Sequence, residues 1–256
     1  METVLLEQKA EGVLLVTLNR PKAGNALSSQ MAEELLGVWR SDETRSQRAI
    51  VLTGAGDRIF CAGADLKERD GMSDARWVEQ HRLFETMRDA LIDLPCPILC
   101  AVNGAAYGGG TEIALACDFA YAAPTARFAL TEVKLGIMPG LGGTQNLARA
   151  AGERRAREVL LTGEPFGAED ALAWGVVNRV CEDVVGEALA TASKIAANAP
   201  LSVQAIRRAL REGMVLPMRE ALDAELKAYD TLTPTDDRRE GIAAFNEKRP
   251  PRFTGR

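Results

Sequence analysis

The sequence predicts an α/β fold with a helical C-terminal part, and two patterns support this prediction. Short apolar runs alternate with amphipathic segments through about residue 150, which is typical of strands and helices in βαβ units. From about residue 152 helical patterns dominate, with one short apolar run near 176–180. We therefore expect an α/β core at 1–195 and a helical region for assembly or capping at 196–256.

The first 54 residues predict one βαβ unit. Residues 12–19 and 48–54 are apolar runs bounded by polar residues or glycine, as expected for buried strands. Between them, Ser28 or Ser29 precedes apolar positions at helical spacing, including Leu35 and Trp39, and therefore caps a helix.

One long helix and three more strands are expected before residue 131. The helix spans 74–93, and its apolar stripe should face the core. The strands are the apolar runs 97–102, 119–123 and 126–130. The stripe on the helix consists of Trp77, Leu83, Phe84, Met87, Ala90 and Leu91.

Composition argues against several classes of function. The 256 residues are 46% hydrophobic and 26% charged, with a formal net charge of -5, which disfavours nucleic acid as a partner. No run of 18 apolar residues and no charged leader is present, so we expect a cytoplasmic protein without a membrane partner.

Cysteine and histidine usage argues against disulfides and metal sites. The five cysteines have no CxxC spacing, and all but Cys181 lie in apolar or glycine-rich surroundings, as expected for buried, reduced thiols. The single histidine, His81, leaves little basis for a histidine-dependent triad or metal centre. We therefore expect no bound metal.

A glycine-rich loop follows the second predicted strand. Gly54 and Gly56 are followed by Ile59 where a dinucleotide fingerprint needs its third glycine, so a Rossmann site is disfavoured. The small residues of CAGAD, 61–65, would let backbone approach a ligand closely. A tight turn between two elements explains the same residues equally well.

A second glycine-rich segment, 103–112, predicts a helix start with exposed backbone donors. Gly108, Gly109 and Gly110 place no side chain before the unpaired N–H groups of the first turn, so a carbonyl oxygen could approach them. Glu112 lies in that turn, although the helix dipole alone favours an acid there. A phosphate loop fails, because Gly110-Thr111 stand where its lysine is required.

Glu132 is the second candidate carboxylate. It lies near the end of a predicted strand, 20 residues beyond Glu112, and strand ends in α/β folds commonly face ligands. The alternative is a surface ion pair with Lys134 or Arg127.

Three segments resemble signatures of the enoyl-CoA hydratase, or crotonase, family. They are FCAGADLKE, AAYGGGTEIALACD and LTEVKLGIMPGLGGTQNLAR, in the family's order, and the similarity covers nearly the whole chain. The resemblance implies a crotonase-like (ClpP/crotonase) fold of stacked ββα and βαβ turns. It also implies homotrimers, commonly paired as a dimer of trimers, with the C-terminal helices contributing to trimerisation.

The resemblance also assigns roles to residues. Backbone N–H groups of Ala64 and Gly109 would form an oxyanion hole for the thioester oxygen. Glu112 would mainly activate water, and Glu132 would mainly donate the α-proton. Coenzyme A enters as part of the substrate, so no separate cofactor is expected. Its adenine would contact Ala62, Ala64 and Leu66, and its phosphates Lys67 or, as a weaker candidate, Lys22.

These assignments imply hydration of a 2-enoyl-CoA to a 3-hydroxyacyl-CoA, as in the β-oxidation of fatty acids. Because relatives with other activities often replace one of the two glutamates, retention of Glu112 and Glu132 favours hydration or dehydration. An enoyl-CoA isomerase and a specialised hydroxyacyl-CoA dehydratase remain alternatives.

FCAGADLKER followed by GMS, the segment TEVKLGIMPG and the tail DDRREGIAAFNEKRPPRFTG resemble the methylglutaconyl-CoA hydratases. Some members of that group also bind RNA through a lysine-rich helix. The corresponding residues here, about 25–48, contain no lysine and several acids, which argues against RNA binding. An RNA-binding or scaffolding member of the family is therefore the disfavoured alternative of another class.

Overall fold

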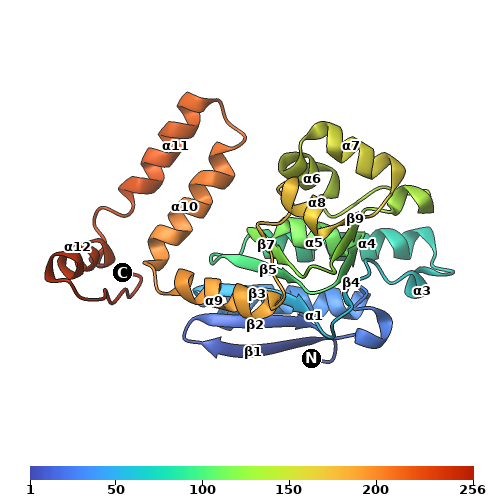
Figure 1. Cartoon of the computed structure of the whole chain (residues 1–256), viewed down its shortest axis with the longest axis horizontal. Helices are drawn as coiled ribbons and strands as arrows, with labels where there is room; N and C mark the ends of the chain where they lie inside the picture. The colour runs from blue at the N-terminus through green and yellow to red at the C-terminus, as the bar shows by residue number, and fades with distance from the viewer.

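The larger of two β-sheets organises the computed structural model, which describes all 256 residues (Figure 1). Its strand order is β1-β2-β3-β5-β7-β10. Strand β1 runs antiparallel to β2, and the remaining neighbours are parallel. The strands are β1 (Val4–Ala10), β2 (Val13–Leu18), β3 (Ala49–Gly54), β5 (Ile98–Val102), β7 (Phe119–Ala122) and β10 (Arg179–Val180).

Helices cover both faces of this sheet, which explains its continuous apolar strands. Along β3, Ile50 and Leu52 join the larger core, to which α1 (Ser29–Arg40) and α4 (Asp74–Ile92) contribute. Ala49 and Val51 point to the other face and pack with α9 (Val184–Ala196). This alternation confirms the predicted buried parallel strand.

A second sheet of four short strands lies beside the first, in the order β4-β6-β8-β9. The sequence analysis predicted β8 but missed β4, β6 and β9, because runs of two or three residues give no clear period-two signal. Strands β4 and β6 carry the chain into the two glycine-rich segments. The strands are β4 (Ile59–Cys61), β6 (Ala105–Tyr107), β8 (Arg127–Ala129) and β9 (Phe166–Gly167).

Most predicted helices are confirmed, including the Ser28 cap, whose hydroxyl accepts from the Met31 N–H at 3.2 Å. The predicted core stripe on α4 is only partly correct: Phe84, Met87 and Leu91 are buried, whereas Trp77 is only half-buried. The remaining helices of the core are η1 (Pro21–Ala23), α2 (Asp42–Arg45), α3 (Leu66–Arg69), α5 (Gly109–Ala116), η2 (Glu132–Leu135), α6 (Gly143–Ala151), α7 (Glu153–Thr162) and α8 (Ala168–Ala173).

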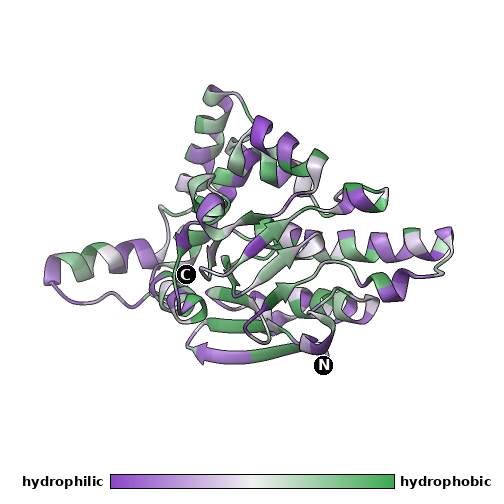
Figure 2. Cartoon of the chain, turned by 45° about the vertical axis from the view of Figure 1, so that its right-hand side comes forward, coloured by the Kyte–Doolittle hydropathy of each residue, from purple (hydrophilic) through white to green (hydrophobic).

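Three C-terminal helices, α10 (Pro200–Gly213), α11 (Met218–Asp230) and α12 (Asp236–Glu247), extend away from the sheets (Figure 1). Hydrophobic residues are interspersed with hydrophilic ones along the helices, whereas the interior strands are mainly hydrophobic (Figure 2). Exposed apolar side chains on the three helices include Ile206, Leu210, Leu222, Leu226 and Phe245. The predicted division at residue 195 falls in the last turn of α9 and stays a prediction.

Two further sequence expectations concern the state of the cysteines and the presence of a membrane-spanning helix. Cys61, Cys96, Cys100 and Cys117 are buried and free, and the free Cys181 is half-buried. Burial raises the pKa of Cys61 to about 12, so this thiol is held neutral. No helix combines the length and apolar character needed to cross a membrane.

Candidate active site

A cavity of about 560 Å³ brings together the four residues predicted to carry the chemistry: Ala64, Gly109, Glu112 and Glu132 all line it. They come from the loop after β4, the first turn of α5 and the start of η2. Strands β4, β6 and β8 are neighbours in the smaller sheet, so the segments that follow them emerge at one edge. The strand pairing therefore collects residues up to 68 positions apart in the chain.

Two free backbone donors face this cavity. The peptides around Ala64 are paired, because the Leu27 N–H donates to Gly63 O at 2.8 Å and the Asp65 N–H donates to Leu27 O at 2.9 Å. The Ala64 N–H itself has no acceptor in the chain, and neither has the N–H of Gly109, the first residue of α5. A helix N-terminus leaves such a donor unpaired and adds a positive potential.

Glycines let these two segments pack backbone to backbone. Gly63 has φ +90°, and a Cβ there would lie 2.7 Å from Tyr107 O. Gly108 has φ +50°, and a Cβ there would lie 3.0 Å from a Glu132 carboxylate oxygen. At Gly110 a Cβ would lie 2.3 Å from Cys61 O. The three glycines 108–110 therefore have two effects: they leave the cavity open to a ligand, and they allow close contact between α5 and β4.

Glu112 is a buried carboxylate with one oxygen fixed. Its side chain is 2% exposed, and Oε1 accepts hydrogen bonds from the Leu141 N–H at 2.7 Å and the Gly143 N–H at 2.8 Å. Burial raises the pKa of Glu112, while these backbone donors oppose the rise by stabilising the charged form. Oε2 accepts no hydrogen bond from the chain and is available to a ligand.

Glu132 lies in a different environment. Its side chain is 8% exposed, and its buried Oε2 has no hydrogen-bond partner. Burial raises the pKa of Glu132 to about 7, and the neighbouring charge of Glu112 adds to the rise. The structure places Glu132 at the start of η2, three residues after the end of β8, and so near the predicted strand end. The alternative of a surface ion pair is wrong, because the side chain is buried.

The two carboxyl groups therefore suit different tasks. Glu112 is held by two donors that favour its charged, proton-accepting form. Glu132, with no donor to Oε2 and a pKa of about 7, holds a proton in part of the population at neutral pH. A pair of groups with separated environments is the usual arrangement for acid and base chemistry in one site.

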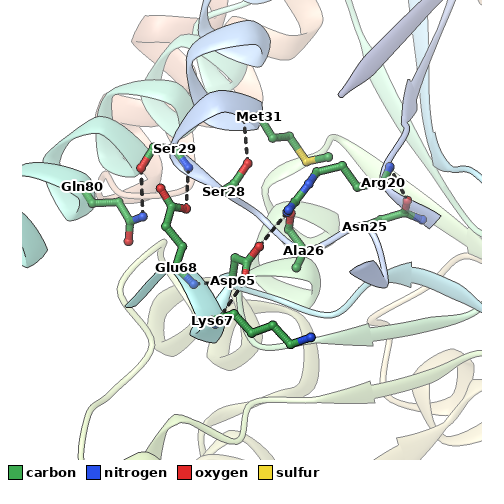
Figure 3. Close-up of polar contacts among 10 residues, drawn as sticks. All are labelled: Arg20, Asn25, Ala26, Ser28, Ser29, Met31, Asp65, Lys67, Glu68 and Gln80. Atoms are coloured by element: carbon green, nitrogen blue, oxygen red, sulfur yellow. Dashed lines mark hydrogen bonds and ion pairs between the residues drawn. The ribbon is translucent and has the colours of Figure 1, made fainter. Parts of the chain in front are cut away.

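An ion pair fixes the loop that carries Ala64. Arg20 Nη1 lies 2.9 Å from Asp65 Oδ2 and also donates to Ala26 O at 2.7 Å. The other oxygen of Asp65 caps α3 by accepting from the Lys67 and Glu68 N–H groups (Figure 3). Because Asp65, the residue directly after Ala64, is held through both carboxylate oxygens, the direction of the Ala64 N–H is fixed before any ligand binds.

The residues predicted to contact coenzyme A fall into two groups. Ala62, Ala64 and Leu66 line the cavity, and Leu66 is 51% exposed. Lys67, on α3, and Lys22, in η1, are exposed and do not line it. The structure thus brings three of the five to the cavity, and the contacts themselves stay predictions.

The sequence analysis placed Trp77 and Phe84 in a core stripe and assigned no ligand contact to His81, Glu85 or Arg69, yet all five line the cavity. Along α4, Trp77, His81 and Glu85 are spaced four residues apart and Phe84 follows His81 by three, and Arg69 ends α3. Their helical spacing was the available signal, but it equally describes a core stripe. All residues that line the cavity lie between 27 and 141, so the C-terminal helices of this chain do not contribute to it.

Together the fold and the cavity define an enzyme that acts on a substrate through its carbonyl group. Two free backbone N–H groups can stabilise a developing oxyanion, and two adjacent carboxyl groups can move protons beside it. No cluster of three or more His, Cys, Asp or Glu side chains is arranged to hold a metal ion.

Comparison with known proteins identifies the class more narrowly. The family model described as enoyl-CoA hydratase/isomerase matches residues 8–256, and the chain belongs to this family. It is 41% identical to the (E)-benzylidenesuccinyl-CoA hydratase of Thauera aromatica over 251 residues, covering 95% of this chain and 96% of that protein. It is 39% identical to the short-chain-enoyl-CoA hydratase of Clostridium acetobutylicum, covering 97% of this chain and 96% of that protein.

A solved structure confirms the predicted crotonase-like fold. The enoyl-CoA hydratase of Bacillus anthracis superimposes with a TM-score of 0.95 at 38% identity, and the match covers 99% of this chain and 100% of that one. Similarity over the full length includes the C-terminal helices as well as the α/β core.

Proposed function

We propose that this protein hydrates 2-enoyl-CoA thioesters to 3-hydroxyacyl-CoA thioesters. The observation that supports this most is the pair Glu112 and Glu132, buried in one cavity with the free N–H groups of Ala64 and Gly109. The names of the two hydratase relatives given above agree with this reaction class.

In the proposed reaction the thioester oxygen accepts hydrogen bonds from Ala64 and Gly109. These bonds polarise the conjugated double bond and stabilise the enolate that forms when the β-carbon is attacked. Losing one such donor typically costs about 10²- to 10³-fold in rate.

The two carboxyl groups complete the addition of water. Glu112, through its free Oε2, accepts a proton from the water whose oxygen bonds to the β-carbon. Glu132 donates its proton to the α-carbon as the enolate collapses. Transfer of the proton gained by Glu112 to Glu132 through solvent or product release restores the starting state. No redox cofactor enters this balance, and coenzyme A enters only as part of the substrate.

The acyl group is a finer proposal. The resemblance of FCAGADLKER and of the tail DDRREGIAAFNEKRPPRFTG to methylglutaconyl-CoA hydratases supports 3-methylglutaconyl-CoA as a candidate substrate. The relatives are named for different acyl groups, a short chain and a benzylidenesuccinyl group, so the family alone does not select among them.

Assembly is a separate part of the proposal. We infer a homotrimer or a dimer of trimers, supported by the exposed apolar side chains of α10, α11 and α12. Light scattering coupled to gel filtration tests this, and a mass equal to one 27.6 kDa chain would contradict it.

The decisive experiment measures loss of enoyl-thioester absorbance with crotonyl-CoA and 3-methylglutaconyl-CoA, with mass spectrometry to detect the added water. Glu112→Gln and Glu132→Gln should each lower kcat by about 10²- to 10⁴-fold. Glu33→Gln, on the exposed side of α1, is the matched control. Unchanged rates in both active-site variants would rule out the mechanism. An isomerised product of unchanged mass would favour the isomerase alternative.

A further inference from the structure

Arg69 is a cation at the cavity that the proposed chemistry does not use. It is the last residue of α3 and lines the cavity that contains Glu112 and Glu132. No other arginine and no lysine is among the lining residues. A guanidinium group remains charged at all physiological pH values, so Arg69 carries a fixed positive charge in this pocket.

The surroundings hold the guanidinium in place. Its central carbon lies 4.2 Å from the centre of the Trp77 ring and 5.6 Å from that of Phe84. Arg69 Nε donates to Gln80 Oε1 at 2.8 Å. Gln80 is 4% exposed, and its amide donates to Ser29 Oγ at 3.0 Å (Figure 3). Stacking and a fixed acceptor therefore orient the planar group without neutralising it.

The two terminal nitrogens of Arg69 have no partner in the chain. They donate no hydrogen bond, and no carboxylate lies within 4.0 Å of any Arg69 nitrogen. Burial lowers the pKa of Arg69, with Glu68 partly opposing the effect, so its surroundings penalise the charge. A half-buried cation without an anion in a ligand cavity is the arrangement expected of a site whose anion arrives with the ligand.

The other charged groups at the cavity leave Arg69 available. His81 Nε2 and Glu85 Oε1 lie 3.5 Å apart on α4, and they pair with each other when His81 is protonated. Glu112 is held by backbone donors from the loop before α6. Arg69 is thus the group at this cavity that offers a fork of two free donors, the geometry that binds a carboxylate through both oxygens.

We propose that Arg69 is a substrate-recognition residue that binds a carboxylate at the distal end of the acyl group, which makes the preferred substrates enoyl-CoA thioesters of dicarboxylic acids. This inference rests on the proposed hydratase function and adds a substrate class to it. The free Nη1 and Nη2 groups would each donate one charge-assisted hydrogen bond to the carboxylate. A neutral acyl chain would displace water from the guanidinium without pairing with it. The preference for acidic over neutral acyl groups therefore comes from this cost as well as from the hydrogen bonds to the carboxylate.

The test compares substrates matched in shape. The acidic probe is trans-glutaconyl-CoA, and the neutral probe is trans-5-methyl-2-hexenoyl-CoA, in which an isopropyl group replaces the carboxylate. The parent enzyme should have the higher kcat/KM with the acidic probe. Arg69→Met, which keeps an unbranched chain against Trp77, should lower the acidic-to-neutral ratio of kcat/KM by about 10- to 100-fold. Arg69→Lys keeps the charge without the fork, so it should restore part of the ratio.

The control is Arg82→Met, the same substitution at an exposed arginine on α4 outside the cavity lining, which should leave the ratio unchanged. Binding of glutaryl-CoA, 5-methylhexanoyl-CoA and free coenzyme A, measured by calorimetry, provides a readout that needs no turnover. Equal loss of all three ligands in Arg69→Met would place the contact at the coenzyme A phosphates and overturn the proposal.

Failure of this inference is distinguishable from failure of the hydratase proposal. If crotonyl-CoA is hydrated but the acidic and neutral probes react alike, or Arg69→Met keeps the parent ratio, the carboxylate site is overturned and hydration stands. If no enoyl-CoA is hydrated, hydration fails, and the preference for glutaryl-CoA over 5-methylhexanoyl-CoA still decides the role of Arg69. If Arg69→Met unfolds, the ratio measured with Arg69→Lys decides it.

Discussion

The two walls of the cavity are built in different ways. One, which we call the backbone wall, is built from the segments 62–64, 108–112 and 139–143, with residues 110, 111, 142 and 143 behind the lining, and it presents N–H groups and glycine Cα atoms. The other, which we call the side-chain wall, consists of Arg69, Trp77, His81, Phe84 and Glu85, and it presents large or charged side chains. The backbone wall contains the groups proposed to act on the thioester, and the side-chain wall those proposed to meet the acyl chain.

This difference separates catalysis from selectivity in physical terms. The oxyanion donors belong to the main chain, and strand pairing and the Asp65 ion pair hold them in place without contacting the acyl chain, so one oxyanion site serves many acyl groups. Side chains on α3 and α4 can be exchanged without disturbing those donors. Selectivity for the acyl group can therefore change while the catalytic mechanism stays the same. The predictions below perturb the backbone wall, the side-chain wall or Glu132, and each asks whether the rest of the site responds.

The largest effect is expected from Gly110→Ala in the backbone wall. A Cβ at this position would lie 2.3 Å from Cys61 O and 2.8 Å from Cys61 Cβ, so α5 and β4 must separate. Overpacking of this kind costs about 1–3 kcal/mol of unfolding free energy. Displacement of the Gly109 N–H should lower kcat by about 10²-fold for acidic and neutral acyl groups alike.

Gly37→Ala is the matched control for this variant. Gly37 lies within α1, and a Cβ there meets no atom within 4 Å, so alanine should be neutral or slightly stabilising. Thermal unfolding and kcat with crotonyl-CoA measure the two effects. A fully active, equally stable Gly110→Ala enzyme would show that close packing of α5 on β4 is not required.

The backbone wall was largely predictable from the sequence. Glycines at 63 and 108–110 indicate close backbone approach, and Glu112 falls in the helix turn that follows them. The role of the loop before α6 was not predictable, because a glycine-rich segment does not reveal that the Leu141 and Gly143 N–H groups bind a carboxylate 29 and 31 residues earlier. Such long-range pairing depends on how β6, β8 and η2 are placed relative to one another.

The side-chain wall was not predictable in the same way. Trp77 and Phe84 share one apolar stripe on α4, yet Phe84 is buried and Trp77 is half-buried beside Arg69. Helical periodicity distinguishes a face from its opposite but does not distinguish a core contact from a cavity lining. Arg69 gave no signal, because a charged residue at the end of a short helix is usually solvated.

A smaller effect, on stability, is expected from the pH response of Glu132. Because burial raises its folded-state pKa to about 7 from the usual 4.5, the folded chain holds a proton that the unfolded chain releases. Between about pH 4.5 and 7, rising pH therefore lowers the free energy of unfolding, and above pH 7 the penalty is constant. Glu132→Gln removes this penalty. The difference in free energy of unfolding between the variant and the parent should therefore be up to about 3 kcal/mol more favourable to the variant at pH 8 than at pH 4.

Denaturant unfolding of both proteins at pH 4, 6 and 8 measures this difference. Glu33→Gln on the exposed side of α1 is the control. A constant difference between Glu132→Gln and the parent across this range would show that Glu132 does not retain its proton on folding. In the activity assay, kcat/KM of the parent should fall as pH rises above about 7, because the protonated form of Glu132 is the proposed donor.

The smallest effect is expected from Gln80, which positions Arg69 without lining the cavity. Gln80→Met removes the acceptor of the Arg69 Nε–H and leaves the guanidinium held by Trp77 and Phe84 alone. The preference for trans-glutaconyl-CoA should fall by about 3- to 10-fold through a higher KM, with kcat nearly constant, because the change acts on Arg69 indirectly, through the loss of one hydrogen bond of about 1 kcal/mol.

Gln80→Glu separates positioning from charge. It keeps an acceptor for Arg69 Nε but adds an anion beside the guanidinium, so it should weaken binding of glutaryl-CoA more than Gln80→Met does. Gln30→Met, on the exposed side of α1, is the control. If both Gln80 variants keep the parent preference while remaining folded, the orientation of Arg69 does not depend on Gln80. Stacking on Trp77 and Phe84 would then be sufficient to hold the guanidinium, and Trp77 would be the next residue to exchange.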